Sequence, residues 1–371
     1  MPRRAREEDV IATRRRGGCR KYLQSLFTIA IFAILLLIGG GWFFWQAMQS
    51  PYKGYPEPVR LVEVRHGQRT STIIRHLQQQ GILRDEYVPL IYMKIGRSGE
   101  SLKAGVYEFT KALSPVEVID KLVRGDVIQK TVTIREGLDR FQIGRIFAAE
   151  GFGRAADWDK LTADPEPVRD IAPQAQTLEG YLFPDTYKIN PGTTPRAIIK
   201  IMVQNFRKNF GGEMAYISSG LDLHQTVTLA SIVESEARLP QERPLVASVY
   251  LNRLHKHMLL GADPTVIYAM KIAKRWNGNI HKDDLQIDSP YNTYRFPGLP
   301  PGPIVNPGVA SLRAAAAPSP TDFLYFVAKH DGSHAFSTNI AEHTRNVQIY
   351  QVQWYRNQRA AAQQQHQQPQ R

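Results

Sequence analysis

Hydrophobic and polar positions divide the chain into one long apolar run and many short amphipathic segments. From Tyr22 to Tyr52 no side chain carries a charge, and residues 26–45 are almost entirely apolar. A helix of about 20 residues is roughly 30 Å long, which matches the hydrocarbon thickness of a bilayer. The pattern therefore predicts a transmembrane helix over 22–46, with the aromatic residues 42–45 at one membrane interface.

Charge sets the expected orientation of this helix. The chain has a formal net charge of +13, and residues 1–21 hold eight basic and three acidic side chains. Basic residues flank the cytoplasmic side of a span, so we expect a cytoplasmic arm over 1–21 and an extracytoplasmic remainder on the cytoplasmic (inner) membrane. The alternative is a cleaved signal peptide, but the apolar run is long and no A-x-A pattern follows it. We read the arm as a topology determinant and expect no nucleic-acid partner.

The cysteine content limits the chemistry expected of the extracytoplasmic part. Cys19 is the only cysteine and lies on the expected cytoplasmic side. The exported part therefore has no disulfide, no thiol nucleophile and no cysteine metal site.

An internal repeat follows the apolar run. Residues 62–81 (VEVRHGQRTSTIIRHLQQQG) and 132–151 (VTIREGLDRFQIGRIFAAEG) align without a gap. Each copy predicts a short strand, a turn at Gly67 or Gly137, and a helix that ends at a glycine. Between them a further strand precedes a helix that Ser114 caps, with Pro115 at its first position.

The first repeat unit resembles LysM-like domains, whose strand, turn and helix bind N-acetylated glycans. A strand, glycine turn and amphipathic helix is also a common packing unit, so a structural spacer is the alternative. We expect a LysM-like module over 58–130.

The stretch TLASIVESEARLPQERPLVASVYLNRL (228–254) places two glutamates in an apolar helix. At 100° per residue, Glu234 and Glu236 flank the centre of the apolar arc on opposite sides, so they cannot act as a pair on one face. A carboxyl group at the margin of an apolar face loses hydration, which suits a general acid. The alternative is a pair of boundary glutamates that bind Arg238, Arg243 or Arg253.

Other segments surround this helix with candidate groove residues. Glu179, in the aromatic loop and short strand of 178–195, is either a second functional carboxylate or an exposed loop charge. Residues 289–319 are rich in Pro, Gly, Asn and Tyr, a composition for an aromatic-lined wall that contacts sugars. A hairpin about Asp331 and Gly332 and a closing helix over 340–355 follow. His330 and His334 flank that hairpin turn, and we expect exposed histidines there rather than a metal pair.

Several motifs then resemble, in order and spacing, the endolytic murein transglycosylase family (YceG-like, MltG). They are LASIVESEA, VASVYLNRL, DPTVIYAM, YNTYRFPGLPPGPIVNPG and LYFVAKHDGSHAFSTN. The resemblance implies a single-pass membrane protein that cuts peptidoglycan glycan strands internally. The family's catalytic acid, the first glutamate of V-E-x-E, falls on Glu234, a choice that helical geometry left open.

The family's reaction needs one carboxylate, whereas ordinary glycosidases use two. The C6 hydroxyl of N-acetylmuramic acid attacks its own anomeric carbon, giving a 1,6-anhydro end. Position in the matching motifs assigns substrate-binding roles to Glu236, Asn252, Asp263, Thr265, Tyr291, Asn292 and Tyr294. Pro300, Pro301 and Gly302 are expected to shape the loop.

The expected architecture is α+β. It has the arm and span, the LysM-like module, a mixed α+β catalytic domain over 131–355 and a disordered tail over 356–371. We expect no cofactor and no metal, with glycan strands, the membrane and peptidoglycan synthases as partners. A non-catalytic glycan-binding scaffold of the cell-wall synthesis machinery is the competing interpretation.

Overall fold

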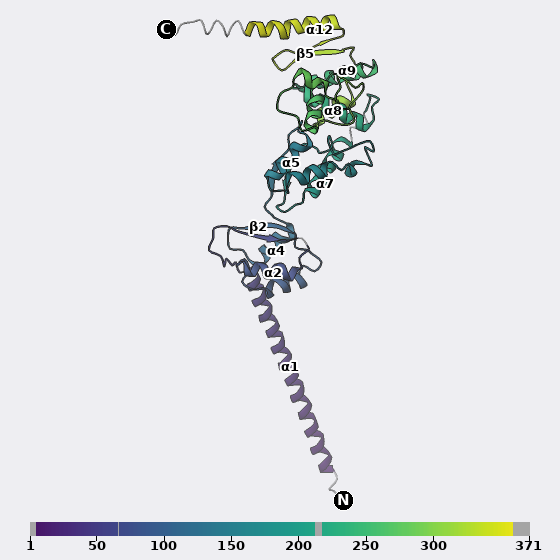
Figure 1. Cartoon of the computed structure of the whole chain (residues 1–371). Helices are drawn as coiled ribbons and strands as arrows, with labels where there is room; N and C mark the ends of the chain where they lie inside the picture. Colours follow the sequence, from purple (N-terminus) through teal and green to yellow (C-terminus); the bar gives the residue numbers. More distant parts are fainter. Residues whose placement is uncertain (1–4, 66, 212–216, 359–371) are drawn as a thin grey trace, which may run out of the picture. The chain divides into compact units, whose positions relative to one another are not determined.

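A computed structural model describes residues 5–65, 67–211 and 217–358, with side chains from Gln24 onward. It forms two compact units, Met1–Gln129 and Lys130–Arg371 (Figure 1). The side chains of the predicted basic arm and residues 359–371 of the predicted tail lie outside the described part. Arg356–Gln358, where that tail was expected to begin, are helical.

The N-terminal helix α1 spans Ala5–Gln49. Its segment Gln24–Gln49 is long and apolar enough to cross a membrane by length and composition. Large apolar side chains such as Phe32, Leu37 and Trp42 are 65%, 76% and 65% exposed, since no other part of the described structure covers them. An apolar segment whose side chains are this exposed is consistent with a single membrane anchor.

After α1, the described part of the first unit forms a two-stranded antiparallel sheet with three further helices. Strand β1 (Arg60–Val64) pairs with β2 (Gly105–Phe109), with Val62 opposite Tyr107. Helices α2 (Thr70–Gln79) and α3 (Tyr87–Ile95) lie between the strands in sequence, and α4 (Pro115–Arg124) follows. Ile74, Leu77, Tyr107 and Ile119 are 0% exposed in its core. A separate hydrophobic core makes this unit a folded body of its own.

Local sequence signals explain the helix and turn positions here. Both repeat copies form the predicted strand, turn and helix, and Gly67 and Gly137 have φ of 81° and 77°. Ser114 and Glu117 form a capping box on α4, with Pro115 at its first position. Left-handed glycines and capping boxes depend on neighbours in sequence, so these predictions are confirmed.

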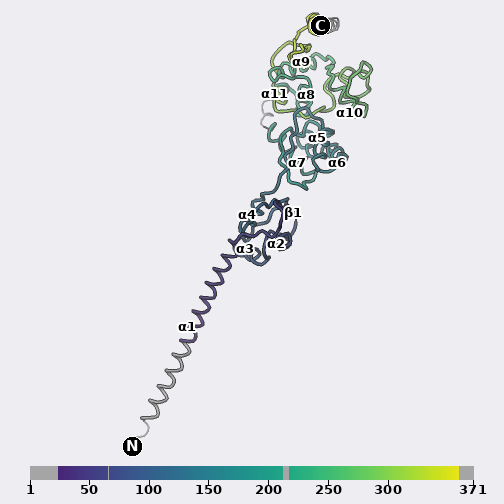
Figure 2. Tube along the Cα trace, turned by 90° about the vertical axis from the view of Figure 1, so that its left-hand side faces the viewer, coloured from purple at the N-terminus to yellow at the C-terminus, as the bar shows by residue number. Residues whose placement is uncertain are grey.

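The second unit begins with β3 (Lys130–Thr133), which pairs antiparallel with β4 (Thr186–Ile189). Between them come α5 (Arg140–Ala149), α6 (Ala155–Thr162) and the 3-10 turn η1 (Glu166–Val168). Helix α7 (Pro195–Gly211) packs beside α6 (Figure 2). The stacked rings of Phe147 and Trp158, 4.7 Å apart, join α5 to α6.

The rest of this unit is mainly helical. Helix α8 (Leu223–Glu236) packs against α9 (Arg243–His255) and α11 (Val309–Ala316), as Figure 2 also shows. The remaining elements are α10 (Asp263–Ile272), the hairpin β5 (Tyr325–Ala328) and β6 (His334–Ser337), α12 (Ile340–Val347), the π-helical turn η5 (Gln348–Gln353) and the 3-10 turns η3 (Pro240–Glu242) and η4 (Lys282–Gln286). The mixed helix and strand architecture agrees with the α+β prediction.

Helix α8 is buried on nearly every side. Its apolar residues Val227, Leu229, Ile232 and Val233 are 0% exposed. Its hydroxyls are satisfied locally: Thr228 donates to the carbonyl of His224 at 2.8 Å, and Ser231 donates to that of Thr228 at 2.7 Å. Burying each large apolar side chain stabilises the fold by about 1.5–3 kcal/mol. The helix that carries Glu234 is therefore a rigid support.

Candidate active site around Glu234

Glu234 lies in the last turn of α8, where the helix leaves the core. Its side chain is 6% exposed, whereas Ile232 and Val233, which precede it, are 0% exposed. Asp222 and Gln225 form a capping box at the other end of α8 and fix its start. The carboxylate is thus held at the edge of the core rather than on the open surface.

Both oxygens of this carboxylate accept a hydrogen bond. Nη2 of Arg243, the first residue of α9, lies 3.1 Å from Oε1 of Glu234. The backbone N–H of Gly308, just before α11, donates to Oε2 at 3.0 Å. Donors from two different helices fix the orientation of the carboxylate. One of the predicted alternatives, an ion pair with Arg243, is therefore present.

An open cavity of about 570 Å³ lies next to Glu234. Its walls come from both strands of the β3–β4 sheet, and its lining residues are Thr133, Ile134, Arg135, Glu136, Pro184, Asp185, Thr186 and Glu234. The antiparallel pairing of β3 with β4, with Thr133 opposite Thr186, brings the two sides together. A nearly buried carboxylate beside an open, polar cavity is an arrangement suited to acid–base chemistry on a bound molecule.

Glu136 is a second carboxylate in this cavity. Its Oε2 lies 3.9 Å from the same Nη2 of Arg243, and its carboxylate packs so closely on Gly308 that a Cβ there would overlap it. Loss of hydration, followed by the nearby charge of Glu234, raises the pKa of Glu136, while Arg243 opposes the shift. Two carboxylates therefore share one guanidinium group.

Glu179 is a buried carboxylate that bonds the chain segments next to the site. The side chain is 1% exposed, so the expected alternative of an exposed loop charge is wrong. It accepts the N–H of Arg140 at the start of α5 and the side-chain amide of Asn306 at 2.8 Å. Burial raises the pKa of Glu179 to about 8, against the opposing backbone hydrogen bond from Arg140. The Arg140 N–H is shared by both oxygens of Glu179, and Asn306 donates to one of them, so Glu179 joins the start of α5 to Asn306.

Asn306 joins three chain segments at this point. Its side-chain amide donates to the carbonyl of Leu138 at 2.9 Å, and its Oδ1 accepts the N–H of Leu182 at 2.9 Å. Its backbone carbonyl accepts the N–H of Gly137 at 2.9 Å. Asn306 thereby holds the turn after β3, which carries Glu136, beside the segment that leads to Gly308.

Glu236 belongs to a different group of side chains. Tyr250 donates to its Oε1 at 3.2 Å. Burial raises the pKa of Glu236 to about 7, the hydrogen bond from Tyr250 lowers it, and the charge of Asp263 raises it further. The hydroxyl of Tyr294 donates to Oδ1 of Asp263 at 2.5 Å. The structure thus brings three predicted groove residues together, Glu236, Asp263 and Tyr294.

The other predicted groove residues have mainly internal contacts. The amide of Asn252 donates to the carbonyls of Thr321 and Phe323 at 2.7 and 3.0 Å. Thr265 and Asn292 are 0% exposed and bond within the fold, Thr265 to the carbonyl of Ala262 at 2.7 Å and Asn292 to that of Leu285 at 2.9 Å. The contacts of these three side chains hold loops in place.

Tyr291 and the Pro-Pro-Gly loop pack together. The ring of Tyr291 lies 5.0 Å from that of Tyr268, and burial raises the pKa of its hydroxyl to about 12. Nε2 of His224 lies 2.9 Å from the carbonyl of Pro301, and Gly302 approaches the Tyr291 hydroxyl. The packing explains why a rigid loop sequence is needed here.

The two hairpin histidines have separate partners. Nδ1 of His334 lies 2.7 Å from Oε2 of Glu242, and the His334 side chain is 9% exposed, so the expectation of an exposed histidine is wrong there. His330 stacks on Trp354 with ring centres 3.7 Å apart. Both side chains therefore tie the hairpin to neighbouring elements.

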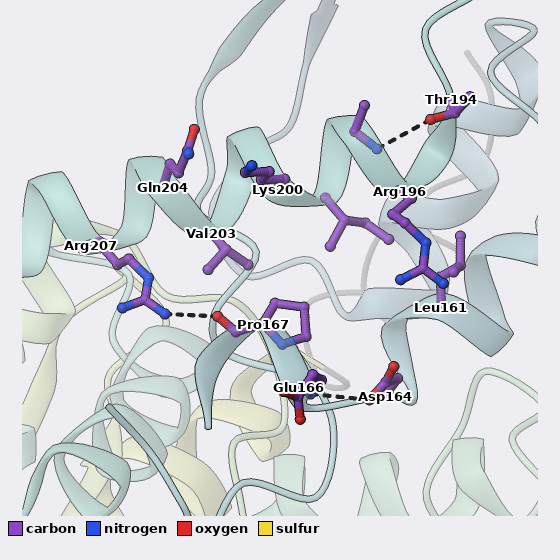
Figure 3. Close-up of a pocket in the computed structure, with 12 residues that line it drawn as sticks. Leu161, Asp164, Glu166, Pro167, Thr194, Arg196, Lys200, Val203, Gln204 and Arg207 are labelled. Carbon is purple, nitrogen blue, oxygen red and sulfur yellow. Dashed lines mark hydrogen bonds between the residues drawn. The ribbon is translucent and has the colours of Figure 1, made fainter. Parts of the chain in front are cut away.

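A larger cavity, of about 670 Å³, lies between α6, η1 and α7. Figure 3 shows Arg207 directed at Pro167, whose carbonyl it bonds at 2.8 Å. Arg207 is also paired with Asp170, so its charge is already matched. None of the residues that line this cavity contacts Glu234, and size alone does not make it the site.

Comparison with known proteins identifies the family of this chain. The sequence model of the YceG-like family matches residues 62–349. The chain belongs to the YceG-like family. The match begins at β1, spans both compact units and includes every candidate residue described above.

Curated relatives of this YceG-like chain carry one name. A protein named endolytic murein transglycosylase from Bacillus subtilis is 33% identical over 335 residues, covering 85% of this chain and 91% of its own length. One of the same name from Streptococcus pneumoniae is 29% identical and is matched over 64% of its own length. The crystal structure of a YceG-like protein from Listeria monocytogenes is 33% identical, with a TM-score of 0.53 over 78% of this chain and 99% of that chain.

Sequence reasoning alone missed three residues of this YceG-like site: Glu136, Asn306 and Gly308. They contact Glu234 or its support from distant parts of the chain. One signal was available for Glu136, because the first repeat copy has His66 at the aligned position, so only the second copy places a carboxylate before the turn glycine.

Proposed function

We propose that this protein is a membrane-anchored endolytic lytic transglycosylase that cleaves peptidoglycan glycan strands and leaves 1,6-anhydromuramic ends. The observation that carries the proposal is the nearly buried Glu234 carboxylate beside an open polar cavity, in a chain of this family. The names of the curated relatives support the same reaction.

Glu234 is the proposed catalytic residue. Its carboxyl group first donates a proton to the oxygen that links N-acetylmuramic acid to N-acetylglucosamine. The bond from the anomeric carbon to that oxygen breaks, and the C6 hydroxyl of the muramic acid forms a new bond to the same carbon. Glu234 accepts the proton that this hydroxyl releases. Atoms and charges balance without water, and proximity replaces a second carboxylate.

The remaining candidates divide into two roles. Glu236, Asp263 and Tyr294 form a polar cluster next to α8, and we propose them together with Tyr291 as contacts for sugar hydroxyl and acetamide groups. For Asn252, Thr265 and Asn292 we propose an indirect role, because their side chains already bond loop carbonyls.

We also propose that the first unit is LysM-like and binds glycan. The order β1–α2–α3–β2 and the antiparallel pair support this proposal. A polar cavity of about 510 Å³ along β1 and α2 offers a site, lined by Glu63, Arg65, Gln68, Thr72, Arg75, His76 and Gln79. In a Glu234→Gln background, Gln79→Ala combined with Thr72→Ala should weaken co-sedimentation with insoluble peptidoglycan several-fold. Unchanged co-sedimentation would favour a structural spacer.

The anchor gives the proposed location. The basic arm favours a cytoplasmic N-terminus in the inner membrane and an extracytoplasmic active site. An enzyme held there acts on strands close to where they are made, so a membrane-bound peptidoglycan synthase is the partner that we propose.

The test of the reaction compares the full-length chain with Glu234→Gln on purified glycan strands. The expected result is 1,6-anhydro ends from the wild type and their loss by at least 10²-fold in the variant. Ordinary reducing ends would indicate a hydrolase. Binding without cleavage by the wild type would favour the scaffold interpretation.

A further inference from the structure

The cavity beside Glu234 contains a carboxylate that the proposed reaction does not use. Glu136 follows β3 directly, in the turn that Gly137 closes. Its side chain is 49% exposed, whereas that of Glu234 is 6% exposed. One carboxylate therefore lies toward the solvent side of the site and the other toward the core.

A single nitrogen atom links the two carboxylates. Nη2 of Arg243 is 3.1 Å from Glu234 and 3.9 Å from Glu136. The shared nitrogen keeps the carboxylates closer together than the roughly 9.5 Å upper limit for paired carboxylates in glycosidases. A small movement of the guanidinium group would exchange one partner for the other.

The present position of Arg243 leaves part of its hydrogen-bonding capacity unused. Its Nε is buried and has no hydrogen-bond partner within the described ranges. A guanidinium group binds a carboxylate best through two nitrogens at once. The contact with Glu234 uses only Nη2, so the arginine is held between two acceptors without a bidentate pair to either.

Gly308 fixes the geometry from the opposite side. Its N–H donates to Glu234, and the Glu136 carboxylate lies against Gly308 in the place that a Cβ would occupy. Since φ of Gly308 is −79°, the glycine is required for close approach and not for an unusual backbone. The two carboxylates thus contact the same arginine and the same glycine.

We propose that Glu136 is a positioning residue that acts through Arg243: it draws the guanidinium away from Glu234 so that Glu234 can hold the proton needed for the first step. The inference rests on the proposed function of Glu234. While Arg243 stays on Glu234, both oxygens of the carboxylate accept a hydrogen bond, so a proton for the first step has to replace one of these donors. Lost hydration is the first cause of the raised pKa of Glu136 and the charge of Glu234 is the second, so the two carboxylates interact.

Other charged or polar groups face the same carboxylate. Arg135 lines the cavity next to Glu136, and Asp185 lines it from the segment before β4. The Oδ1 and Oδ2 atoms of Asp185 already accept hydrogen bonds from the N–H of Thr186 and the amide of Asn205, at 2.7 and 2.9 Å. Within the described residues, Arg243 is the cation that bonds Glu234 directly. It is therefore the group through which Glu136 acts.

The test is the pH profile of 1,6-anhydro end formation by the full-length chain in detergent, at saturating glycan. The rate should fall at high pH as Glu234 loses the required proton. This fall is the alkaline limb of the profile. In Glu136→Gln, Arg243 stays on Glu234 and the negative charge of Glu136 is lost, so the alkaline limb should move to lower pH by about one unit. The rate on the limb then drops about tenfold relative to the rate on the acidic plateau of the same variant.

Arg243→Gln should move the alkaline limb the other way, to higher pH, because the cation that favours ionised Glu234 is gone. Glu150→Gln, an exposed charge at the end of α5, is the matched control and should leave the limb in place. Glu136→Asp, which retracts the carboxylate by one methylene, should shift the limb less than Glu136→Gln.

The proposal is overturned if Glu136→Gln lowers the rate equally at all pH values, or if both variants leave the limb unmoved. If Glu136→Gln does not fold, the shifts of Glu136→Asp and Arg243→Gln decide in the same way. Failure of the proposed function is a separate result, since Glu234→Gln would then still form 1,6-anhydro ends.

Discussion

The N–H of Gly308 donates a 3.0 Å hydrogen bond to Oε2 of Glu234, joining residues that lie 74 positions apart in the chain. This bond connects the start of α11 to the end of α8. The N–H groups at the start of a helix favour a negative charge. The contact depends on a residue without a side chain, which leads to the first prediction.

Gly308→Ala should lower the rate of glycan cleavage by about tenfold, because the new methyl group displaces the Glu136 carboxylate and disturbs Glu234. The backbone at φ −79° accepts alanine, so the thermal unfolding midpoint should change little. Gly211→Ala is the control, since apart from the backbone of its own helix and its chain neighbours no described atom lies within 4 Å of the added methyl group. Equal activity of both variants would show that the close packing at Gly308 is not needed.

Asn306→Ala should destabilise the fold by about 1–3 kcal/mol, because it leaves the buried N–H of Leu182 without its acceptor and removes the side-chain hydrogen bonds to Leu138 and Glu179. Chemical denaturation with tryptophan fluorescence measures the change. Asn205→Ala, which removes an exposed hydrogen bond to Asp185, should cost less than about 1 kcal/mol. Similar losses in the two variants would contradict the framework role of Asn306.

Glu236 should make the fold less stable as the pH rises. Its pKa in the folded state is about 7, above the usual value of 4.5, so the folded state keeps a proton that the unfolded state releases. The stabilising effect is complete below about pH 4.5, and it is lost as the pH rises to about 7 and beyond.

Glu236→Gln should remove this dependence. The loss between pH 5 and pH 8 is about 2–3 kcal/mol, so the variant should gain several degrees in thermal midpoint relative to the wild type over this range. Glu179 has a raised pKa as well and leaves a residual slope of the same sign in both proteins. An unchanged difference between the two proteins at both pH values would show that Glu236 is hydrated in the folded state.

Replacing Leu35 and Leu36 with arginine should release the chain from membranes. Both side chains are exposed on α1, at 60% and 61%, and each arginine opposes insertion by about 2.5–3.5 kcal/mol. Fractionation after carbonate washing measures the change, with Val59→Arg, outside the apolar segment, as the control. Retention of the double variant in the membrane fraction would exclude α1 as the anchor.

Predictions from sequence succeeded where structure depends on near neighbours. The capping box of Ser114 and Glu117, the turns at Gly67 and Gly137 and the helix that carries Glu234 all follow from residues a few positions apart. The pairing of β3 with β4 depends on residues about 55 positions apart, and the sequence pattern gave no partner for either strand.

The candidate site shows the same division. The apolar arc of α8 located Glu234 at the edge of the core, and family resemblance chose it over Glu236. The turn-rich composition of 289–319 indicated a wall, yet it did not reveal which side chains point inward, and Asn292 proved to be buried. The direction in which a loop side chain points is set by packing against distant segments of the chain, and short-range sequence patterns do not encode that packing.

The most direct test of the central claim is mass spectrometry of glycan fragments released by the wild type and by Glu234→Gln, assayed side by side at equal folded concentration. The account predicts fragments with 1,6-anhydromuramic ends from the wild type and at least a 10²-fold loss in the variant, with glycan binding retained. Cleavage by the variant at the wild-type rate would contradict it.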